Sequence, residues 1–286
     1  MKIIRSVNAL IEFIETQKGR EASIGFVPTM GALHDGHLSL VKRAVEENEV
    51  SVVSVFVNPA QFNDPRDLEN YPRTEEEDLK LLAAENVTAV FMPAVEEIYP
   101  EWPEKNIKNY NLGTVAEVME GQYRPGHFQG VAHIVSLLFK LVRPDRAYFG
   151  EKDFQQIAVI RTMIREENLN VDIVACPIKR ASDGLALSSR NKLLTPEERK
   201  NAAEIYATLS GSVEYSKNHS VSATRATVIE HIDAIPGMKV EYFDIVDART
   251  LVSIDEWEES PWIVGCITVY AGKVRLIDNI TYRMPN

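Results

Sequence analysis

Two histidines and two glycines lie close together in the segment PTMGALHDGHLSLV, from Pro28 to Val41. His34 and His37 are three positions apart where an apolar run gives way to a helical pattern, so their rings face the same side of the first turn. Backbone N–H groups there lack helical partners, and the positive end of the helix dipole lies there, so an anion is attracted. Imidazole donors could hold phosphate oxygens as negative charge develops. Gly31 and Gly36 would let a ligand approach the backbone closely.

Two other interpretations of this segment stay open from its residues alone. A metal clip would use both histidines with Asp35, but Asp35 is poorly spaced and no cysteine or further histidine follows in register. A structural corner would place the same histidines in a loop without any ligand. The position directly after a predicted strand favours phosphate binding over both.

Two further polar clusters could meet a phosphate. GEKD, from Gly150 to Asp153, offers Lys152 as a mobile charge, and a cation at a helix start opposes the dipole unless an anion accompanies it. Asp153 alone is most simply an N-cap with Gln156 as its partner. LSSRN, residues 187–191, supplies two hydroxyls and a guanidinium, which could clamp phosphates or form a serine-rich turn.

Other polar groups are less specific. The amides of Gln61 in NPAQF and of Gln156 suit a small hydroxy acid, while Arg124 and His127 in YRPGHF are predicted to lie in a loop. The chain has no GxxxxGK[ST], no GxGxxG after a strand and no GxSxG elbow, which disfavours P-loop NTPases, dinucleotide oxidoreductases and serine hydrolases. The clusters indicate a site that binds and polarises phosphate without a covalent protein nucleophile.

Alternating strands and helices would position these clusters. Apolar runs predict strands at residues 23–27, 50–57, 88–93, 146–150 and 171–177, with helices between them. This order predicts an α/β fold with a Rossmann-like, mostly parallel sheet and helices on both faces. The clusters that begin at Met30, Asn58 and Gly150 each follow a strand, so they share the sheet edge at which active sites lie in such folds.

Apolar stripes and capping residues predict the helices that alternate with these strands. The first has an apolar stripe of Leu10, Ile11 and Ile14. Thr74 and Glu77 predict a capping box, and the acidic run RTEEEDLKLLAAE is most simply a solvated helix face. Two more helices are predicted at residues 131–142 and 153–166.

Past residue 176 the pattern changes. A helix opens at TPEE with Thr195 as N-cap and Glu198 as its reciprocal partner, and a second helix follows. MKVEYFDIV, WIVGCITVY and KVRLIDNI then predict three strands without helices between them. We therefore expect a domain at residues 1–176 and a smaller α+β domain with an antiparallel sheet at residues 177–286.

Composition limits the partners. The 286 residues are 45% hydrophobic and 26% charged, as in an ordinary globular protein. The 31 basic and 42 acidic residues give a net charge of -11, which disfavours nucleic acid and anionic membranes as partners. Cys176 and Cys266 suggest neither a disulfide framework nor a zinc site. No signal peptide or run of about 18 apolar residues is visible, so we expect a cytoplasmic protein.

A family resemblance adds to this. HDGH after the first strand and LSSR near the domain boundary resemble the nucleotidyltransferase superfamily with the HxGH signature, which is related to class I aminoacyl-tRNA synthetases. PTMGALHDGH, FVNPAQF, YPRT, RPGHFQGV, FGEKDFQQ and DGLALSSRN also occur in the order and approximate spacing of the pantothenate synthetase (pantoate–β-alanine ligase) family. The resemblance covers nearly the whole chain.

The resemblance implies an ATP-dependent ligase. (R)-Pantoate and ATP would give an enzyme-bound pantoyl adenylate and pyrophosphate, and β-alanine would displace AMP to give pantothenate, a coenzyme A precursor. His37 would be the proton donor or charge stabiliser, with His34, Lys152 and Arg190 as further catalytic groups. Mg²⁺ would bridge the phosphates without a dedicated protein cage, and the enzyme would be a homodimer. Because the adenylate must be shielded from water until the amine arrives, we also expect the domain at residues 177–286 to close as a lid.

The resemblance also implies the binding residues. Gln61 and Gln156 would bind pantoate, and Gln61 would also bind β-alanine. Many members have an apolar residue at the position of Lys179 and contact adenine through its backbone. A lysine at this position would therefore change only the side-chain packing at the adenine edge. The residues implied to bind ATP are Met30, Gly31, Ala32, Leu33, His34, Asp35, Gly36, His37, Gly150, Glu151, Lys152, Asp153, Lys179, Leu187, Ser188, Ser189 and Arg190.

Three competing functions share part of this pattern. An RNA-charging enzyme shares the HxGH turn but needs a basic tRNA-binding module, which the acidic balance and the short C-terminal region disfavour. A nucleotidyltransferase with a dinucleotide product would lack the two-glutamine pocket. A non-catalytic nucleotide-binding module would bind ATP without turning it over.

Overall fold

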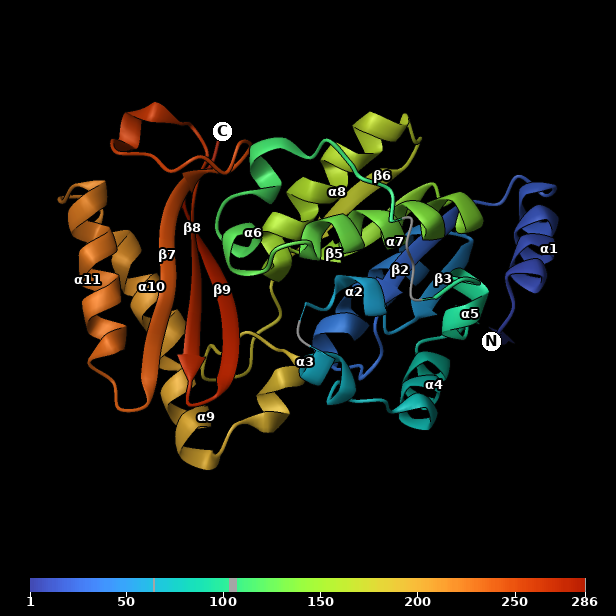
Figure 1. Cartoon of the computed structure of the whole chain (residues 1–286), viewed down its shortest axis with the longest axis horizontal. Coiled ribbons are helices and arrows are strands. Elements are labelled where there is room, and N and C mark those ends of the chain that lie inside the picture. Colours follow the sequence, from blue (N-terminus) through green and yellow to red (C-terminus); the bar gives the residue numbers. More distant parts are fainter. Residues whose placement is uncertain (64, 103–106, 286) are drawn as a thin grey trace. The chain divides into compact units, whose positions relative to one another are not determined.

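The computed structural model describes residues 1–63, 65–102 and 107–285 (Figure 1). Its internal contacts divide the chain into two compact units. The N-terminal unit comprises residues 1–112, 123–151 and 156–177, and the C-terminal unit comprises residues 113–122, 152–155 and 178–286. Each unit is described by itself.

A parallel sheet of six strands forms the centre of the N-terminal unit, in the order β1-β4-β3-β2-β5-β6. The predicted parallel sheet is therefore confirmed. Because β2 lies between β3 and β5, the loops after these three strands start from one edge. The strands are β1 (Lys2–Ile4), β2 (Ile24–Thr29), β3 (Val50–Val55), β4 (Ala89–Phe91), β5 (Arg146–Gly150) and β6 (Asp172–Cys176).

Helices cover both faces of this sheet. Successive side chains of a strand point to opposite faces, and on β2 the ring of Phe26 meets Phe139 of α7 at a centroid distance of 6.2 Å while Val27 packs with Val41 of α2. The helices are α1 (Val7–Lys18), α2 (Asp35–Glu47), α3 (Pro65–Glu69), α4 (Glu75–Ala84), α5 (Val95–Ile98), α7 (His127–Val142) and α8 (Phe154–Glu167), with 3₁₀ turns η1 (Pro59–Gln61) and η3 (Glu151–Asp153).

Several local predictions need correction. β2 continues through Pro28, where the sequence predicts its end. A short edge strand, β1, precedes it in the chain and was not predicted from the sequence. Ile11 is 41% exposed, and Phe13 takes its place on the buried face of α1. Helix α7 begins at His127, which is therefore not a loop residue.

The capping box predicted at Thr74 is wrong. Thr74 precedes α4, but its side chain makes no cap hydrogen bond. Its hydroxyl instead donates to Oδ1 of Asp78 over 3.2 Å. Asp78 is buried, so the helix face predicted to be solvated contains a buried carboxylate.

An antiparallel sheet in the order β7-β8-β9 forms the C-terminal unit, with α11 against β7 and α10 against β9 (Figure 1). Both predictions for this region, the three successive strands and the capping box of Thr195 and Glu198, are confirmed. Its elements are η2 (Gly113–Ala116), α6 (Glu120–Tyr123), η4 (Ser189–Leu193), α9 (Pro196–Ala202), α10 (Glu204–Tyr215), α11 (Val221–Asp233), β7 (Met238–Asp247), η5 (Trp257–Glu259), β8 (Ile263–Ala271) and β9 (Val274–Arg283).

A buried carboxylate, Glu120, ties the segment 113–122 to this sheet. Arg275 of β9 donates two hydrogen bonds to the carboxylate of Glu120, over 2.8 and 2.6 Å, and also pairs with Glu241. The hydroxyls of Tyr242 and Thr268 donate to the same Glu120 carboxylate over 2.9 and 3.0 Å. Burial of these charges is tolerated because each is paired and hydrogen-bonded.

Candidate active site

The turn after β2 has an unusual backbone. Gly31 and Ala32 both have positive φ, at 79° and 50°. The N–H of Gly31 donates to Oγ1 of Thr29 over 3.2 Å, and those of Ala32 and Leu33 donate to the Asp78 carboxylate over 3.0 and 2.8 Å. These amides are therefore used inside the protein.

His34 ends this turn as the N-cap of α2. Its Nδ1 accepts the N–H of Gly36 over 3.1 Å, so Nδ1 carries no proton and the neutral ring holds its proton on Nε2. The His37 ring lies 4.1 Å from the His34 ring between centroids, tilted by 40°. Both rings are half-buried, and Asp35 between them is exposed. The two imidazoles thus form one surface at the start of α2.

The loop after β3 brings Gln61 to the same edge. Nε2 of Gln61 approaches Sδ of Met30 at 3.1 Å, and Oε1 of Gln61 accepts from Nδ2 of Asn58 over 3.0 Å. Gln61 therefore touches the turn that leads to the histidines. Its amide is held by a buried asparagine that the sequence did not single out.

Helix α7 fixes this loop from the other side. Nδ1 of His127 lies 2.9 Å from the Gln61 carbonyl oxygen, and its Nε2 lies 3.2 Å from Nη1 of Arg124. The carbonyl can only accept, so Nδ1 of His127 donates and Nε2 accepts from the guanidinium. A Cβ on Gly130 would come within 2.2 Å of the Ala60 carbonyl oxygen, so this close approach requires glycine.

The residues after β5 divide between the two units. Gly150 and Glu151 belong to the N-terminal unit, whereas Lys152 and Asp153 belong to the C-terminal unit. Lys152 is half-buried in η3, and its carbonyl accepts from Nδ2 of Asn279 over 3.2 Å. Asp153 is exposed.

The adjacent glutamines of FGEKDFQQ have different surroundings. Gln156 is half-buried on α8. Gln155 is buried, donates to the carbonyls of Val115 and Val118 over 2.9 and 2.8 Å, and accepts from the N–H of Glu120 over 3.1 Å. Gln155 therefore secures the segment 113–122.

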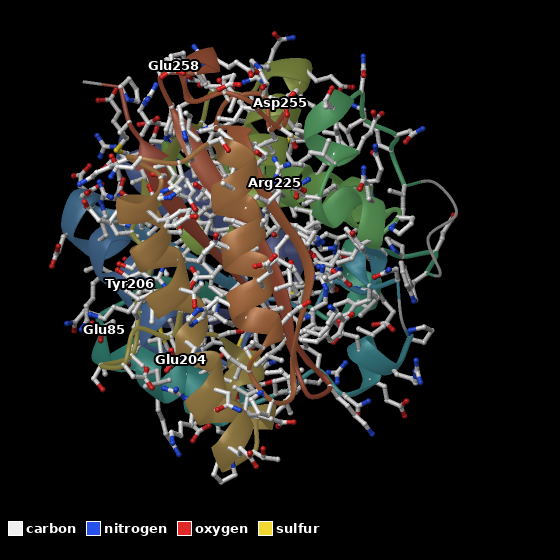
Figure 2. The ribbon with its side chains drawn as sticks, turned by 90° about the vertical axis from the view of Figure 1, so that its left-hand side faces the viewer. Glu85, Glu204, Tyr206, Arg225, Asp255 and Glu258 are labelled. Carbon is white, nitrogen blue, oxygen red and sulfur yellow. The ribbon has the colours of Figure 1, made fainter. Side chains whose placement is uncertain are left out.

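The loop of residues 178–190 lies in the C-terminal unit and is organised by Arg180. Its guanidinium donates to Asp278 over 2.6 and 2.9 Å and to the Gly184 carbonyl over 3.1 Å. It also lies 3.8 Å above the ring of Tyr206 on α10, which is labelled in Figure 2. Lys179 beside it is exposed.

Backbone contacts complete this loop. The carbonyl of Lys179 accepts the N–H of Leu187 over 2.9 Å. Ser188 caps η4, since its hydroxyl accepts the N–H of Arg190 over 3.3 Å. Ser188, Ser189 and Arg190 are all half-buried.

The structure thus brings some predicted residues together. Met30, His34, His37 and Gln61 lie at one edge of the parallel sheet, and the loop of Gly150 starts from the same edge. Of the other residues implied to bind ATP, those of the turn at residues 31–36 and Glu151 belong to the N-terminal unit, and seven belong to the C-terminal unit: Lys152, Asp153, Lys179, Leu187, Ser188, Ser189 and Arg190.

Several supporting residues were not predicted from the sequence, namely Asn58, Asp78, Gln155 and Arg180, and the contact of His127 with the Gln61 loop was not expected either. Asp78 could have been found, because it lies four residues before buried Leu82 and so shares its helix face. Gln155 could have been found in the same way, because it lies four residues before buried Val159 on α8. Asn58 and Arg180 lie outside helices and have no periodic pattern around them.

Comparisons with known proteins agree with one another. A family model described as pantoate-beta-alanine ligase matches residues 2–281. The chain is 53% identical over 283 residues to pantothenate synthetase of Bacteroides fragilis, covering 99% of each chain. It is 56% identical over 282 residues to that of Porphyromonas gingivalis, again with 99% of each covered.

Solved structures give the same result. Pantothenate synthetase from Thermus thermophilus has a TM-score of 0.91 at 42% identity, with 99% of this chain and 100% of that one covered. The Francisella tularensis pantoate-beta-alanine ligase, complexed with beta-gamma ATP and beta-alanine, has a TM-score of 0.81 at 34% identity, with 99% and 98% covered. Within the described ranges, no helix has the length and apolarity needed to cross a bilayer.

Proposed function

The chain belongs to the pantoate–β-alanine ligase family, and from that premise we propose which of its residues carry the reaction. Its activity is the ATP-dependent ligation of pantoate and β-alanine to pantothenate. The observation that supports our assignment most is the pair of adjacent imidazoles at the start of α2, next to the contact between Met30 and Gln61.

We propose two displacements. A carboxylate oxygen of (R)-pantoate attacks the α-phosphorus of ATP, the bond to the bridging oxygen breaks, and pyrophosphate leaves with its electron pair. The amine of β-alanine then attacks the carbonyl carbon of pantoyl adenylate, and AMP leaves as the amine loses a proton. The first step is mainly a matter of positioning and charge stabilisation, so fixed donors suffice without a protein nucleophile.

The two histidines have different parts in this proposal. Because Nδ1 of His34 is used for capping, the group that His34 can offer to a phosphate oxygen is its Nε2–H. His37 provides the second donor and either transfers a proton or stabilises charge on the leaving pyrophosphate. Lys152, Ser188, Ser189 and Arg190 contribute further phosphate contacts, and Asp153 contacts the ribose.

Gln61 and Gln156 bind pantoate in this proposal. The Gln61 amide is oriented from both ends, by Asn58 and by the sulfur of Met30, so it is preorganised for a hydroxy acid. Gln61 also faces β-alanine, which places the amine near the carbonyl carbon that it attacks.

We propose that Mg²⁺ enters with ATP. Among the described residues, no group of three or more His, Cys, Asp or Glu side chains could hold a metal ion. Mg²⁺ would neutralise phosphate charge when bound. The protein's own share is to orient the phosphates through the histidines and Lys152.

Three wider features complete the proposal. The domain at residues 177–286 shields the adenylate from water as a lid, since it carries Arg190. The enzyme acts as a homodimer, and it acts in the cytoplasm. Sedimentation of the purified chain tests the dimer. The rate at which AMP is released by hydrolysis without β-alanine tests the lid, because this rate rises if the adenylate is no longer shielded from water.

Isotope exchange between pyrophosphate and ATP tests the adenylate route. We expect exchange to require pantoate but not β-alanine, and AMP release to require β-alanine. A ternary mechanism without an adenylate would need all three substrates for exchange, which would overturn the proposal. A product that retains AMP would indicate a nucleotidyltransferase instead.

A further inference from the structure

Asp78 is a buried carboxylate that the reaction proposed above does not use. It lies on α4 and is 1% exposed. Its Oδ2 accepts the N–H of Ala32, and its Oδ1 accepts both the N–H of Leu33 and the hydroxyl of Thr74. A buried carboxylate is costly unless hydrogen bonds replace its water, and here three donors do so.

The backbone of the turn explains why these donors converge. Gly31 and Ala32 both have positive φ, which turns the N–H groups of Ala32 and Leu33 toward one point. Successive N–H groups in such a turn form a concavity that binds anions. The anion in this concavity is the protein's own Asp78 side chain.

The turn leads directly into the histidine pair. Leu33, whose N–H is held by Asp78, is followed by His34, the N-cap of α2. Leu33 and Leu82 also belong to one buried cluster, so α4 packs beneath the turn that its carboxylate holds. A displaced turn would therefore carry the His34 ring with it.

We propose that Asp78 is a positioning residue of the phosphate site. It holds the backbone of residues 31–33 so that His34 and His37 present their rings together, and it touches no substrate. The proposal rests on the role assigned to the histidines under the proposed function. It also means that the N–H groups of Ala32 and Leu33 bind Asp78 and not the ATP phosphates.

Asp78→Asn tests this with little change of shape. The amide keeps one acceptor but sets a donor against a backbone N–H, so one of the two turn contacts is lost. We expect kcat/KM for ATP to fall about 10- to 100-fold, the range for a hydrogen bond to a charged group. Amide hydrogen exchange at Ala32 and Leu33 should accelerate as well. Glu77→Gln, at the exposed neighbouring position, is the matched control and should change neither.

A second measurement needs no variant. In isotope-labelled wild-type protein titrated with ATP and Mg²⁺, ring resonances of His34 and His37 should shift, and amide exchange at Ala32 and Leu33 should stay as slow as it is without ATP. ATP-dependent protection of these two amides would overturn the proposal. So would an Asp78→Asn enzyme with wild-type kcat/KM, or Glu77→Gln with the same loss.

The two proposals fail differently. If His37→Ala is inactive while Asp78→Asn is normal, only the positioning role of Asp78 is lost. If His37→Ala keeps full activity, the histidine assignment itself fails, whatever Asp78→Asn does.

Discussion

Two loops that carry predicted ATP-binding residues are organised by charges of opposite sign, a buried carboxylate in one and a half-buried guanidinium in the other. In the N-terminal unit, the Asp78 carboxylate gathers backbone N–H groups of the turn at residues 31–33. In the C-terminal unit, the Arg180 guanidinium gathers the carbonyls of Gly184 and Asn279, within the loop 178–190 and beside it. Each charge orients backbone dipoles that a mobile loop would otherwise turn toward water.

The two charges differ in how they are balanced. Asp78 is satisfied by two amides and a hydroxyl, all of them neutral. Arg180 is paired with a full charge on Asp278, whose side chain is only 3% exposed. Loss of Asp78 therefore leaves unpaired dipoles in one turn, whereas loss of Arg180 leaves an unpaired buried charge, which is more costly. We expect Asp78 variants to affect mainly function and Arg180 variants to affect mainly folding.

Arg180→Gln should have the largest effect on stability. It leaves Asp278 buried without its partner, so the free energy of unfolding in urea should fall by about 3–5 kcal/mol. The double variant Arg180→Gln with Asp278→Asn should recover much of this, because no buried charge remains. Arg249→Ala, which removes an arginine that is 63% exposed, is the control and should cost little. An equal loss in single and double variants would show that the charge is not the cause.

Gly31→Ala should lower the free energy of unfolding by a smaller amount. The same substitution at Gly126 serves as the matched control. Gly31 and Gly126 have nearly the same φ, 79° and 81°, so alanine costs each about 1–2 kcal/mol of backbone strain. A Cβ on Gly31 would also lie 3.0 Å from Oδ2 of Asp78, while one on Gly126 meets nothing within 4 Å. We expect Gly31→Ala to cost about 1 kcal/mol more in urea unfolding. Equal costs would mean that the turn and Asp78 adjust freely to each other.

His34 variants separate capping from phosphate binding. His34→Ala removes the side-chain cap of α2 and should lower the free energy of unfolding by about 1 kcal/mol, whereas His34→Asn keeps a capping acceptor and should preserve stability. Both should lower kcat/KM for ATP, because both lack the ring. Full activity of the asparagine variant would limit His34 to a structural role.

The smallest effect is expected for Asp183, in the same loop as Arg180. The hydrogen bond from Arg199 holds the pKa of Asp183 below its usual value. A lowered pKa means that the stabilisation is present above the unfolded-state pKa of about 4 and is lost as the pH falls through the folded value.

The pair is partly exposed, so Asp183→Asn should cost less than about 1 kcal/mol at pH 7. The difference from wild type in urea unfolding should vanish once the pH is below the lowered folded pKa, and should shrink in high salt. A difference that persists in acid would assign the effect to packing instead.

The fold could be predicted from the sequence because its patterns are local. The β-branched run of β3 and the capping box of Thr195 determine their elements without help from distant residues. Thr74 shows the limit of such reasoning, since the same box pattern fails where a buried acceptor, Asp78, takes its hydroxyl. The candidate site divides in the same way: His34 and His37 are visible from their spacing, but the turn before them is held by Asp78, which is 46 positions from Ala32.

The rate of pantoate-dependent pyrophosphate exchange in His37→Ala tests the central claim most directly. We predict a fall of about 100-fold or more, with circular dichroism and the urea midpoint unchanged from wild type. A folded variant that exchanges at the wild-type rate would contradict the assignment of the histidine pair to the ATP phosphates.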